Sequence, residues 1–159
     1  MALILALLAL FLTAQPVGAN SASPEAVTVT SAKLADPNTD PYLNDKRGVI
    51  LYGFLNTYNS PLKGYTADFI KSADKYNLDW RLLAAISGVE STFGHQIPYN
   101  SYNAWGWGIY GDNMIYFKSY PEAIETISKS LRENYINKWG AQNVYQIGRF
   151  YAASPTWAQ

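Results

Sequence analysis

The chain has 159 residues, a formal net charge of +0 from 12 basic and 12 acidic side chains, and no cysteine. This length allows one domain with a core of its own, the balanced charge excludes the concentrated basic face that nucleic-acid binding requires, and the lack of cysteine excludes a disulfide framework. The 5 tryptophans and 13 tyrosines can supply a core and also flat surfaces for a ligand with apolar faces, such as a sugar.

The N-terminal residues 1–19 have the pattern of a secretory signal peptide. An apolar stretch from Leu3 to Leu12 is followed by the small residues 17–19, which predicts cleavage after Ala19. The alternative is an uncleaved anchor, but the apolar run is short for a membrane span of about 20 residues. We therefore expect a secreted protein of the bacterial cell wall or periplasm.

Residues 20–45 are rich in Ser, Thr, Asn, Asp and Pro and have no sustained periodicity, so they are expected to form a flexible linker to a domain over residues 46–159. Asp36 begins a run like that of a calcium-binding loop, but Pro41 stands where that loop needs Gly and Arg47 where it needs Glu. With 1 histidine and no cysteine, transition-metal ligands are also lacking, and we expect neither a metal nor another cofactor.

After the linker the apolar residues recur with helical periodicity. A first helix is expected up to Pro61, and a second runs from a Thr66 N-cap to Asn77. The apolar stripe of the first helix comprises Ile50, Phe54 and Tyr58, and that of the second Phe69, Ala73 and Tyr76.

A third, central helix is expected over the segment WRLLAAISGVES, with Asp79 as its N-cap. Its apolar face comprises Leu82, Leu83, Ile86 and Val89. Glu90 follows at the C-terminal edge of that face, where partial burial and the negative end of the helix dipole both favour a carboxyl group that keeps its proton. Such a group can protonate a glycosidic oxygen. The alternative is a structural carboxylate that binds loop amides.

Helical periodicity disappears between Ser91 and Ser119, where several glycines and a proline interrupt the chain. We expect a cleft here, with room for a short hairpin around residues 111–113, because so long an irregular segment usually serves a function. Trp105 and Trp107 are separated by one residue, so in extended backbone one would line the groove and the other would pack in the core.

Ser119 and Glu122 predict a capping box that opens a long helix, which continues to about Trp139. Its apolar stripe comprises Ile124, Ile127, Leu131 and Tyr135. A last helix is expected from Gln142 to Ala152, with Val144, Ile147 and Tyr151 facing inward. The expected fold class is therefore mainly α, with an irregular loop or short hairpin lobe that forms a groove.

The domain contains, in this order, the segments YTADFIKSADKYNLDWRLLAAISGVESTFG, SYNAWGWG, FKSYPEAIETISKSLRENY and IGRFYAASPTWA. Together they resemble the lysozyme-like superfamily of peptidoglycan-cleaving enzymes. The segment AISGVESTFG resembles the Glu-Ser signature of lytic transglycosylases, whereas NAWGWG, FKSY and YAASPTWA resemble bacterial glucosaminidase domains. The resemblance implies a lysozyme-like catalytic domain that acts as a monomer and cleaves β-1,4 glycosidic bonds of peptidoglycan glycan strands.

The resemblance makes Glu90 the general acid and, in the transglycosylase branch, also the base. Ser91 follows the Glu in that signature, where it either serves the site or bonds back to the helix end. Glucosaminidase domains usually carry a second acid on a hairpin, and here Asp112 is the sole acid available in that segment. Hydrolysis normally needs two carboxyl groups, whereas a transglycosylase manages with one, so the sequence favours single-acid chemistry.

Further residues of the groove follow from the same resemblance. Asn103, Trp105 and Gly106 match the Asn-x-aromatic-Gly pattern of glucosaminidase domains and are expected to shape the groove floor, together with Trp107. Tyr151 matches the late tyrosine that faces the site in the family, although its helical spacing also allows a place in the core. All are expected to bind substrate, as are Ser91 and Asp112.

Two alternatives remain open at this point. The domain could be a non-catalytic peptidoglycan-binding or scaffolding module of the same fold, because the second acid is missing. The chain could also be a C-terminally truncated fragment, since the family's last helix continues beyond the segment TWA and this sequence ends at Gln159.

Overall fold

The structure, a computed structural model, describes residues 40–109, 114–152 and 156–159. Within these ranges the regular secondary structure is helical and no strand occurs, so the expected mainly α fold class is confirmed. The expected signal peptide, most of the expected linker and the hairpin around residues 111–113 lie outside the described residues. No helix among the described residues combines the length and apolar character needed to span a membrane.

The N-terminal part of the fold consists of short helices that pack on one another. They are η1 (Pro41–Asn44), α1 (Lys46–Thr57), η2 (Pro61–Tyr65) and α2 (Thr66–Lys75). Asp40, Asp45 and Ser60 cap the first three by accepting hydrogen bonds from backbone amides of the first turn. The helix η1 falls within the range expected as linker, and it packs against α1 and α2.

The first helix is confirmed, but its expected inward stripe is wrong. Ile50 and Phe54 are 61% and 45% exposed, whereas Leu51 and Leu55 are 3% and 0% exposed. The helix carries large apolar side chains on both sides, so periodicity alone does not distinguish its buried face. The outward side chains of α1 form an apolar surface with α3.

The second helix has the expected buried residues Phe69 and Ala73, but the predicted Thr66 cap is wrong. The preceding helix η2 runs directly into α2, so Thr66 is already helical. The N-cap position falls on Tyr65, which makes no capping side-chain bond.

The central helix α3 spans Leu82–Ser91 and begins later than the sequence pattern indicated. The Asp79 carboxylate accepts a hydrogen bond of 2.9 Å from the Arg81 amide just before it. Leu83 and Ile86 are buried as expected, but Val89 is 58% exposed, because it points to the same apolar surface as the outward side of α1.

The long helix predicted after residue 119 is confirmed as α4 (Tyr120–Ser130) and a continuing π-helical segment, η3 (Leu131–Lys138). All residues of its expected stripe are buried. Ser119 caps it by accepting a bond of 3.3 Å from the Glu122 amide. In return, the Glu122 carboxylate accepts a hydrogen bond of 2.6 Å from the Lys118 amide. A capping box would use the Ser119 amide instead.

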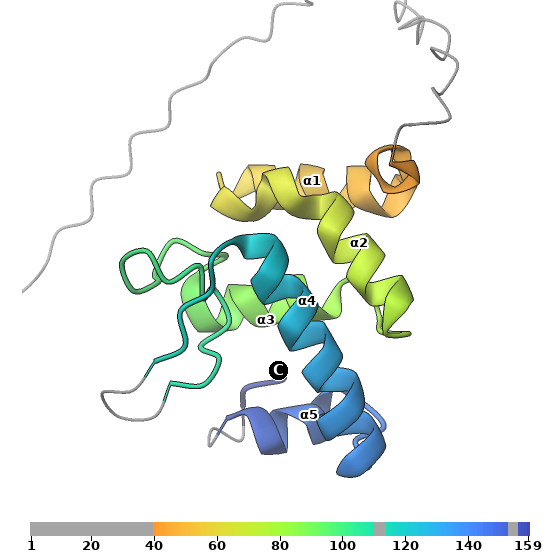
Figure 1. The fold of residues 1–159 in the computed structure, drawn as a ribbon, viewed down its shortest axis with the longest axis vertical. Coiled ribbons are helices and arrows are strands. Elements are labelled where there is room, and N and C mark those ends of the chain that lie inside the picture. Colours follow the sequence, from red (N-terminus) through yellow and green to blue (C-terminus); the bar gives the residue numbers. More distant parts are fainter. Residues whose placement is uncertain (1–39, 110–113, 153–155) are drawn as a thin grey trace, which may run out of the picture. The chain divides into compact units, whose positions relative to one another are not determined.

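The last helix, α5 (Val144–Tyr151), is capped by Asn143 and buries Ile147, whereas Val144 is 39% exposed at its first turn. In Figure 1, α4 passes across α3 in the middle of the molecule, with α1 and α2 above and α5 below. The chain between α3 and α4 lies to one side of these helices. One continuous hydrophobic core receives side chains from all of the α-helices. Its residues include Leu51, Leu55, Leu62, Phe69, Leu83, Ile86, Trp105, Ile124, Ile127, Leu131 and Ile147.

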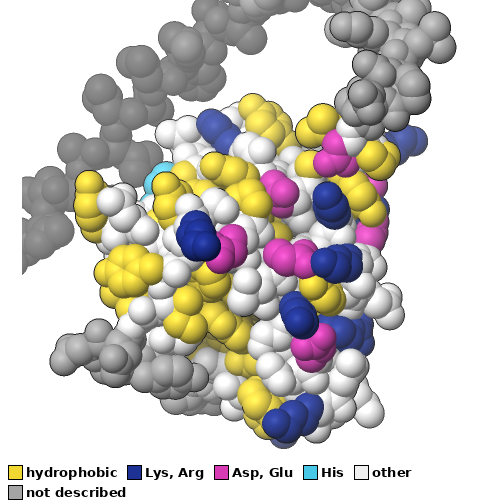
Figure 2. Space-filling view, viewed as in Figure 1, with side chains coloured by type: hydrophobic (Ala, Val, Ile, Leu, Met, Phe, Trp, Pro, Cys, Tyr) yellow, Lys and Arg dark blue, Asp and Glu magenta, His cyan; other side chains and the backbone are white. Residues whose placement is uncertain are grey.

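The surface agrees with the balanced composition. On the face in Figure 2, basic and acidic side chains are interspersed, and no large patch carries a single sign. Some of these opposite charges form ion pairs between helices, such as the pair between Lys75 of α2 and Glu125 of α4.

Candidate active site

Glu90 lies in the last turn of α3 and is half-buried. Its carboxyl oxygen Oε1 accepts a hydrogen bond of 2.6 Å from the indole Nε1–H of Trp157. Its other oxygen, Oε2, lies beside Gly106, since a β-carbon on that glycine would be 2.8 Å away from it. Thr92 then ends the helix in the left-handed conformation, with φ of 52°. Each oxygen of the acid therefore lies against a segment remote in sequence, Oε1 against Trp157 and Oε2 against Gly106.

Ser91 ties the end of α3 to the aromatic loop, the name used here for residues 101–109. The buried hydroxyl of Ser91 lies 2.7 Å from the carbonyl oxygen of Ala104 and 3.0 Å from that of Ser87, and it can donate to either. The same oxygen accepts the Gly94 amide at 2.8 Å. Its hydrogen and one of its two acceptor sites are thus used within the protein, so Ser91 positions the helix end and the loop relative to each other.

Asn103 organises the aromatic loop from within. It is 1% exposed, and its side-chain amide donates to the carbonyl oxygens of Trp107 and Ile115, at 2.8 and 3.0 Å. Its carbonyl oxygen accepts the Trp107 amide at 2.9 Å. Because these bonds occupy the whole side chain, Asn103 shapes the loop and does not reach a ligand in this conformation.

The tryptophans of the loop point in different directions. Trp105 is 0% exposed in the core, and its indole donates a hydrogen bond of 2.8 Å to the Leu83 carbonyl of α3. Trp107 is partly buried and lines a cavity beside the loop. Trp105 therefore anchors the loop, while Trp107 presents a ring to whatever occupies the cavity.

Gly106 joins these tryptophans next to the acid. Its φ of 60° is in the left-handed region, where glycine is the favoured residue. It also lines the cavity, and the space that a side chain would fill is occupied by the Glu90 carboxyl group, which therefore lies directly behind the cavity wall.

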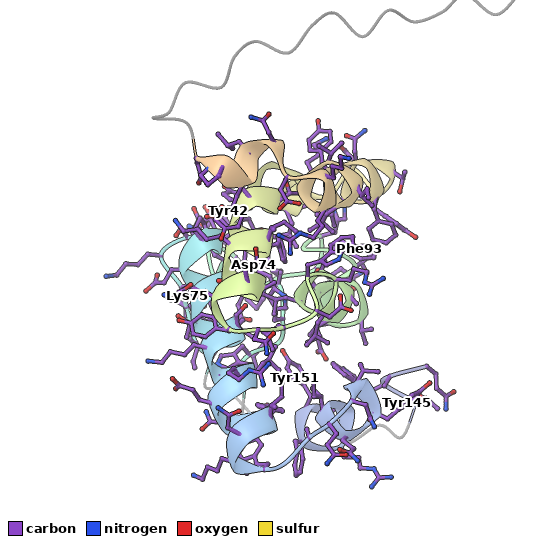
Figure 3. The ribbon with its side chains drawn as sticks, turned by 90° about the vertical axis from the view of Figure 1, so that its right-hand side faces the viewer. Tyr42, Asp74, Lys75, Phe93, Tyr145 and Tyr151 are labelled. Carbon is purple, nitrogen blue, oxygen red and sulfur yellow. The ribbon has the colours of Figure 1, made fainter. Side chains whose placement is uncertain are left out.

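Tyr151, at the end of α5, closes the other side of the site. Figure 3 shows it between the long α4–η3 helix and α5, whereas Tyr145 lies at the periphery. Its hydroxyl donates a hydrogen bond of 2.7 Å to the Trp105 carbonyl, and its ring stacks on Trp157 with centroids 4.9 Å apart. Burial, and then the negative charge of Glu90, raise the pKa of the Tyr151 phenol far above its ordinary value. The hydroxyl stays protonated near neutral pH and remains a donor.

The cavity has a volume of about 380 Å³ and lies between the aromatic loop, η3 and α5. Its walls combine aromatic rings with the polar side chains of Ser130 and Asn134. The aromatic lining residues are Trp107, Tyr135, Trp139, Phe150 and Tyr151. Flat rings with a few polar groups suit a ligand that has apolar faces and hydroxyl edges.

Most of the expected site residues meet in one place. Gly106, Trp107 and Tyr151 line the cavity, and Glu90 lies against Gly106 behind the cavity wall. Ser91, Asn103 and Trp105 support this arrangement from the interior. Asp112 lies outside the described residues.

Sequence reasoning missed the residue that touches the acid, Trp157, as well as the outer cavity walls formed by Tyr135, Trp139 and Phe150. Trp157 stands in the segment YAASPTWA, which had been singled out as a motif, so that segment carried the only available signal. Tyr135 was predicted to lie on the apolar face of the long helix, and helical periodicity does not predict whether a residue on that face also lines a cavity.

Other acids are engaged elsewhere in the described structure. Glu122 binds the Lys118 amide, and Glu125 binds Ser72 and Lys75 on the far side of α4. The cavity-lining residues among those described include no carboxyl group, so Glu90, behind Gly106, is the acid found next to the cavity wall. No group of three or more His, Asp or Glu side chains that could hold a metal ion occurs in the described ranges.

Comparison with known proteins gives no further assignment. No protein-family profile matches the chain, and no curated protein is significantly similar to it. The function is therefore argued from the site itself.

Proposed function

We propose that the protein cleaves β-1,4 glycosidic bonds in the glycan strands of peptidoglycan, with Glu90 as the general acid. The observation that carries the proposal is a half-buried carboxyl group with one oxygen against Gly106, which is itself a residue of the wall of an aromatic-lined cavity. The order of sequence motifs that resembles lysozyme-like enzymes supports the same reaction.

The cavity favours a sugar as ligand. Among its lining residues, Trp139 and Phe150 are 45% and 49% exposed, so their rings can contact the apolar faces of pyranose rings. Ser130 and Asn134 add hydrogen-bonding groups for hydroxyl and acetamido substituents. A volume of about 380 Å³ accommodates a small number of sugar units at once.

The chemistry follows from the single acid. Glu90 transfers its proton to the glycosidic oxygen as the bond from that oxygen to the anomeric carbon breaks. The resulting carboxylate then removes a proton from the nucleophile that attacks the anomeric carbon. Because the described cavity walls carry no carboxyl group that could act together with Glu90, we favour a hydroxyl of the same sugar as nucleophile, which closes an anhydro ring as in lytic transglycosylases.

The N-terminal sequence supports action outside the cytoplasm, in the cell wall or periplasm, where this substrate lies. The aromatic site and the balanced charge fit a polysaccharide better than a nucleic acid.

Digestion of purified peptidoglycan followed by mass spectrometry of the soluble fraction tests the proposal. Anhydromuramic ends indicate a transglycosylase, reducing glucosamine ends a glucosaminidase, and reducing muramic ends a muramidase. Release of no soluble fragments at any protein concentration would overturn the proposal.

The absence of a second carboxyl group from the described cavity walls also fits another function, a binding module without turnover. Such a module would bind insoluble peptidoglycan saturably and release nothing. The same experiment separates the alternatives when bound and released material are both measured.

A further inference from the structure

We infer that Trp157 is a positioning residue for the general acid: its indole N–H fixes the Glu90 carboxyl through Oε1, so that Oε2 is the oxygen that carries and delivers the proton. This inference rests on the proposed function and names the oxygen of Glu90 from which the proton is transferred.

The first step concerns the direction of the hydrogen bond. The indole nitrogen of tryptophan is a donor only, so in the contact of 2.6 Å the Glu90 oxygen Oε1 must accept. A protonated carboxyl group carries its hydrogen on one oxygen. A hydrogen on Oε1 would oppose this bond, and the proton of the acid form therefore resides on Oε2.

The second step concerns access. Oε2 lies beside Gly106, 2.8 Å from where a β-carbon of that residue would be, and Gly106 is part of the wall of the aromatic cavity. Oε1 is covered by Trp157, which is 8% exposed. Of the two oxygens, Oε2 is therefore the one that faces the cavity wall, at a residue without a side chain.

The third step concerns rigidity. The Trp157 ring stacks on Tyr151 at an interplanar angle of 24°, and it fills the space left by Gly148, where a β-carbon would lie 2.8 Å from the ring. Tyr151 is itself bonded to the backbone of the aromatic loop. The indole is thus packed from several sides, which holds the carboxyl plane in one orientation before substrate binds.

The sharpest test replaces Trp157 by 3-(benzothienyl)alanine, which keeps the bicyclic ring but has sulfur in place of the N–H group. We expect kcat on peptidoglycan fragments to fall about 10- to 100-fold, with KM changed by about twofold or less, because orientation of the acid and not binding is lost. The same replacement at Trp80, which lies against Arg81 and away from the cavity, serves as control and leaves kcat unchanged. A benzothienyl variant at position 157 with wild-type kcat would overturn the inference.

A second measurement needs no variant of Trp157. In the folded wild-type protein, the indole ¹H–¹⁵N resonance of Trp157, assigned by connectivity along the chain, is expected downfield and is expected to move upfield on Glu90→Ala, which removes the acceptor. Glu133→Ala, at an exposed position of η3, is expected to leave it in place. An indole resonance that Glu90→Ala leaves unchanged means that the bond does not form, and the inference is then wrong even if the benzothienyl variant fails to fold.

The outcomes separate this inference from the proposed function. If the wild-type protein releases no peptidoglycan fragments, the proposed function fails and the assignment of a transferable proton to Oε2 fails with it. If the wild-type protein is active and Glu90→Gln is not, an active benzothienyl variant overturns the inference alone.

Discussion

The hydroxyl oxygen of Ser91 lies 2.7 Å from the carbonyl oxygen of Ala104 and joins the end of the central helix to the aromatic loop. Both residues are buried, at 2% and 0% exposure, so water does not replace this bond. The loop that carries Trp105, Gly106 and Trp107 is therefore positioned directly on the turn that carries Glu90.

Ser91→Ala is expected to destabilise the protein by about 2 kcal/mol, because it leaves the buried Ala104 carbonyl and Gly94 amide without this partner. Ser87→Ala is the matched control, since the Ser87 hydroxyl bonds only to the Ala84 carbonyl within the same helix. Urea unfolding of the two variants measures the difference. Equal losses of unfolding free energy in the two variants would show that the bond between helix and loop stabilises the fold no more than a hydrogen bond within the helix.

Gly106→Ala is expected to lower kcat by about tenfold or more, because the new methyl group displaces the Glu90 carboxyl as well as straining the backbone. Gly140→Ala separates the two effects. Gly140 also has a positive φ, of 74°, but a β-carbon there meets nothing within 4 Å. Both variants are expected to lose about 1 kcal/mol of stability through backbone strain, and only Gly106→Ala is expected to lose activity. Parallel losses of activity would contradict a direct contact with the acid.

Tyr151 is expected to make stability fall at alkaline pH. Its pKa is raised in the folded state, first by burial and then by the charge of Glu90, whereas the unfolded chain releases this proton near about pH 10. The folded state therefore binds the proton more tightly, and its contribution is complete below about pH 10 and is lost above it, by about 1.4 kcal/mol per pH unit.

Urea unfolding of wild type and Tyr151→Phe at several alkaline pH values tests this sign. The variant is expected to be less stable at neutral pH, because the bond to the Trp105 carbonyl is gone, but to lose stability less steeply as the pH rises. Tyr145→Phe, on the exposed side of the same helix, controls for the loss of a hydroxyl group. Parallel curves for wild type and Tyr151→Phe would refute the expected linkage.

Glu125 is expected to make a small contribution that disappears in acid. Burial acts to raise the pKa of this carboxyl, but hydrogen bonds from Lys75, Tyr76 and Ser72 outweigh burial and hold the pKa below its ordinary value. Its stabilisation is therefore complete above the unfolded-state value of about 4.3 and is lost as the pH falls through the lower folded-state value.

Glu125→Gln is expected to cost about 1 kcal/mol or less at neutral pH, because the ion pair with Lys75 is partly exposed to solvent. The difference from wild type is expected to shrink as the pH is lowered toward about 3. Thermal unfolding at a series of pH values measures it. A difference that stays constant down to strongly acid pH would show that the effect is packing and not charge.

The helices that sequence analysis placed correctly have one clear apolar face. The stripe Ile124, Ile127 and Leu131 recurs at helical spacing with polar residues between, and each member is 0% exposed. In α1, large apolar residues occupy adjacent positions, so Leu55 and Phe54 were equally plausible inward residues. Only packing against the rest of the fold selects between them.

In the candidate site, too, some residues could be identified from the local sequence pattern and others only from the fold. Glu90 could be singled out because an acid at the end of an apolar helix face violates a local pattern. The bond from Trp157 joins residues 67 positions apart, and no local pattern encodes such a contact. Asn103 was expected to shape the groove floor, and its side chain makes two hydrogen bonds with Trp107 and one with Ile115, partners that only the folded chain can reveal.

The most direct test of the central claim is the rate at which Glu90→Gln releases soluble fragments from purified peptidoglycan, measured beside wild type and Glu133→Gln. The amide keeps the size of the side chain and an oxygen to accept the Trp157 bond, but it has no proton to donate. We predict a loss of at least about 1000-fold for Glu90→Gln and wild-type rates for Glu133→Gln. Release by Glu90→Gln at the wild-type rate would contradict the role of Glu90 as the acid.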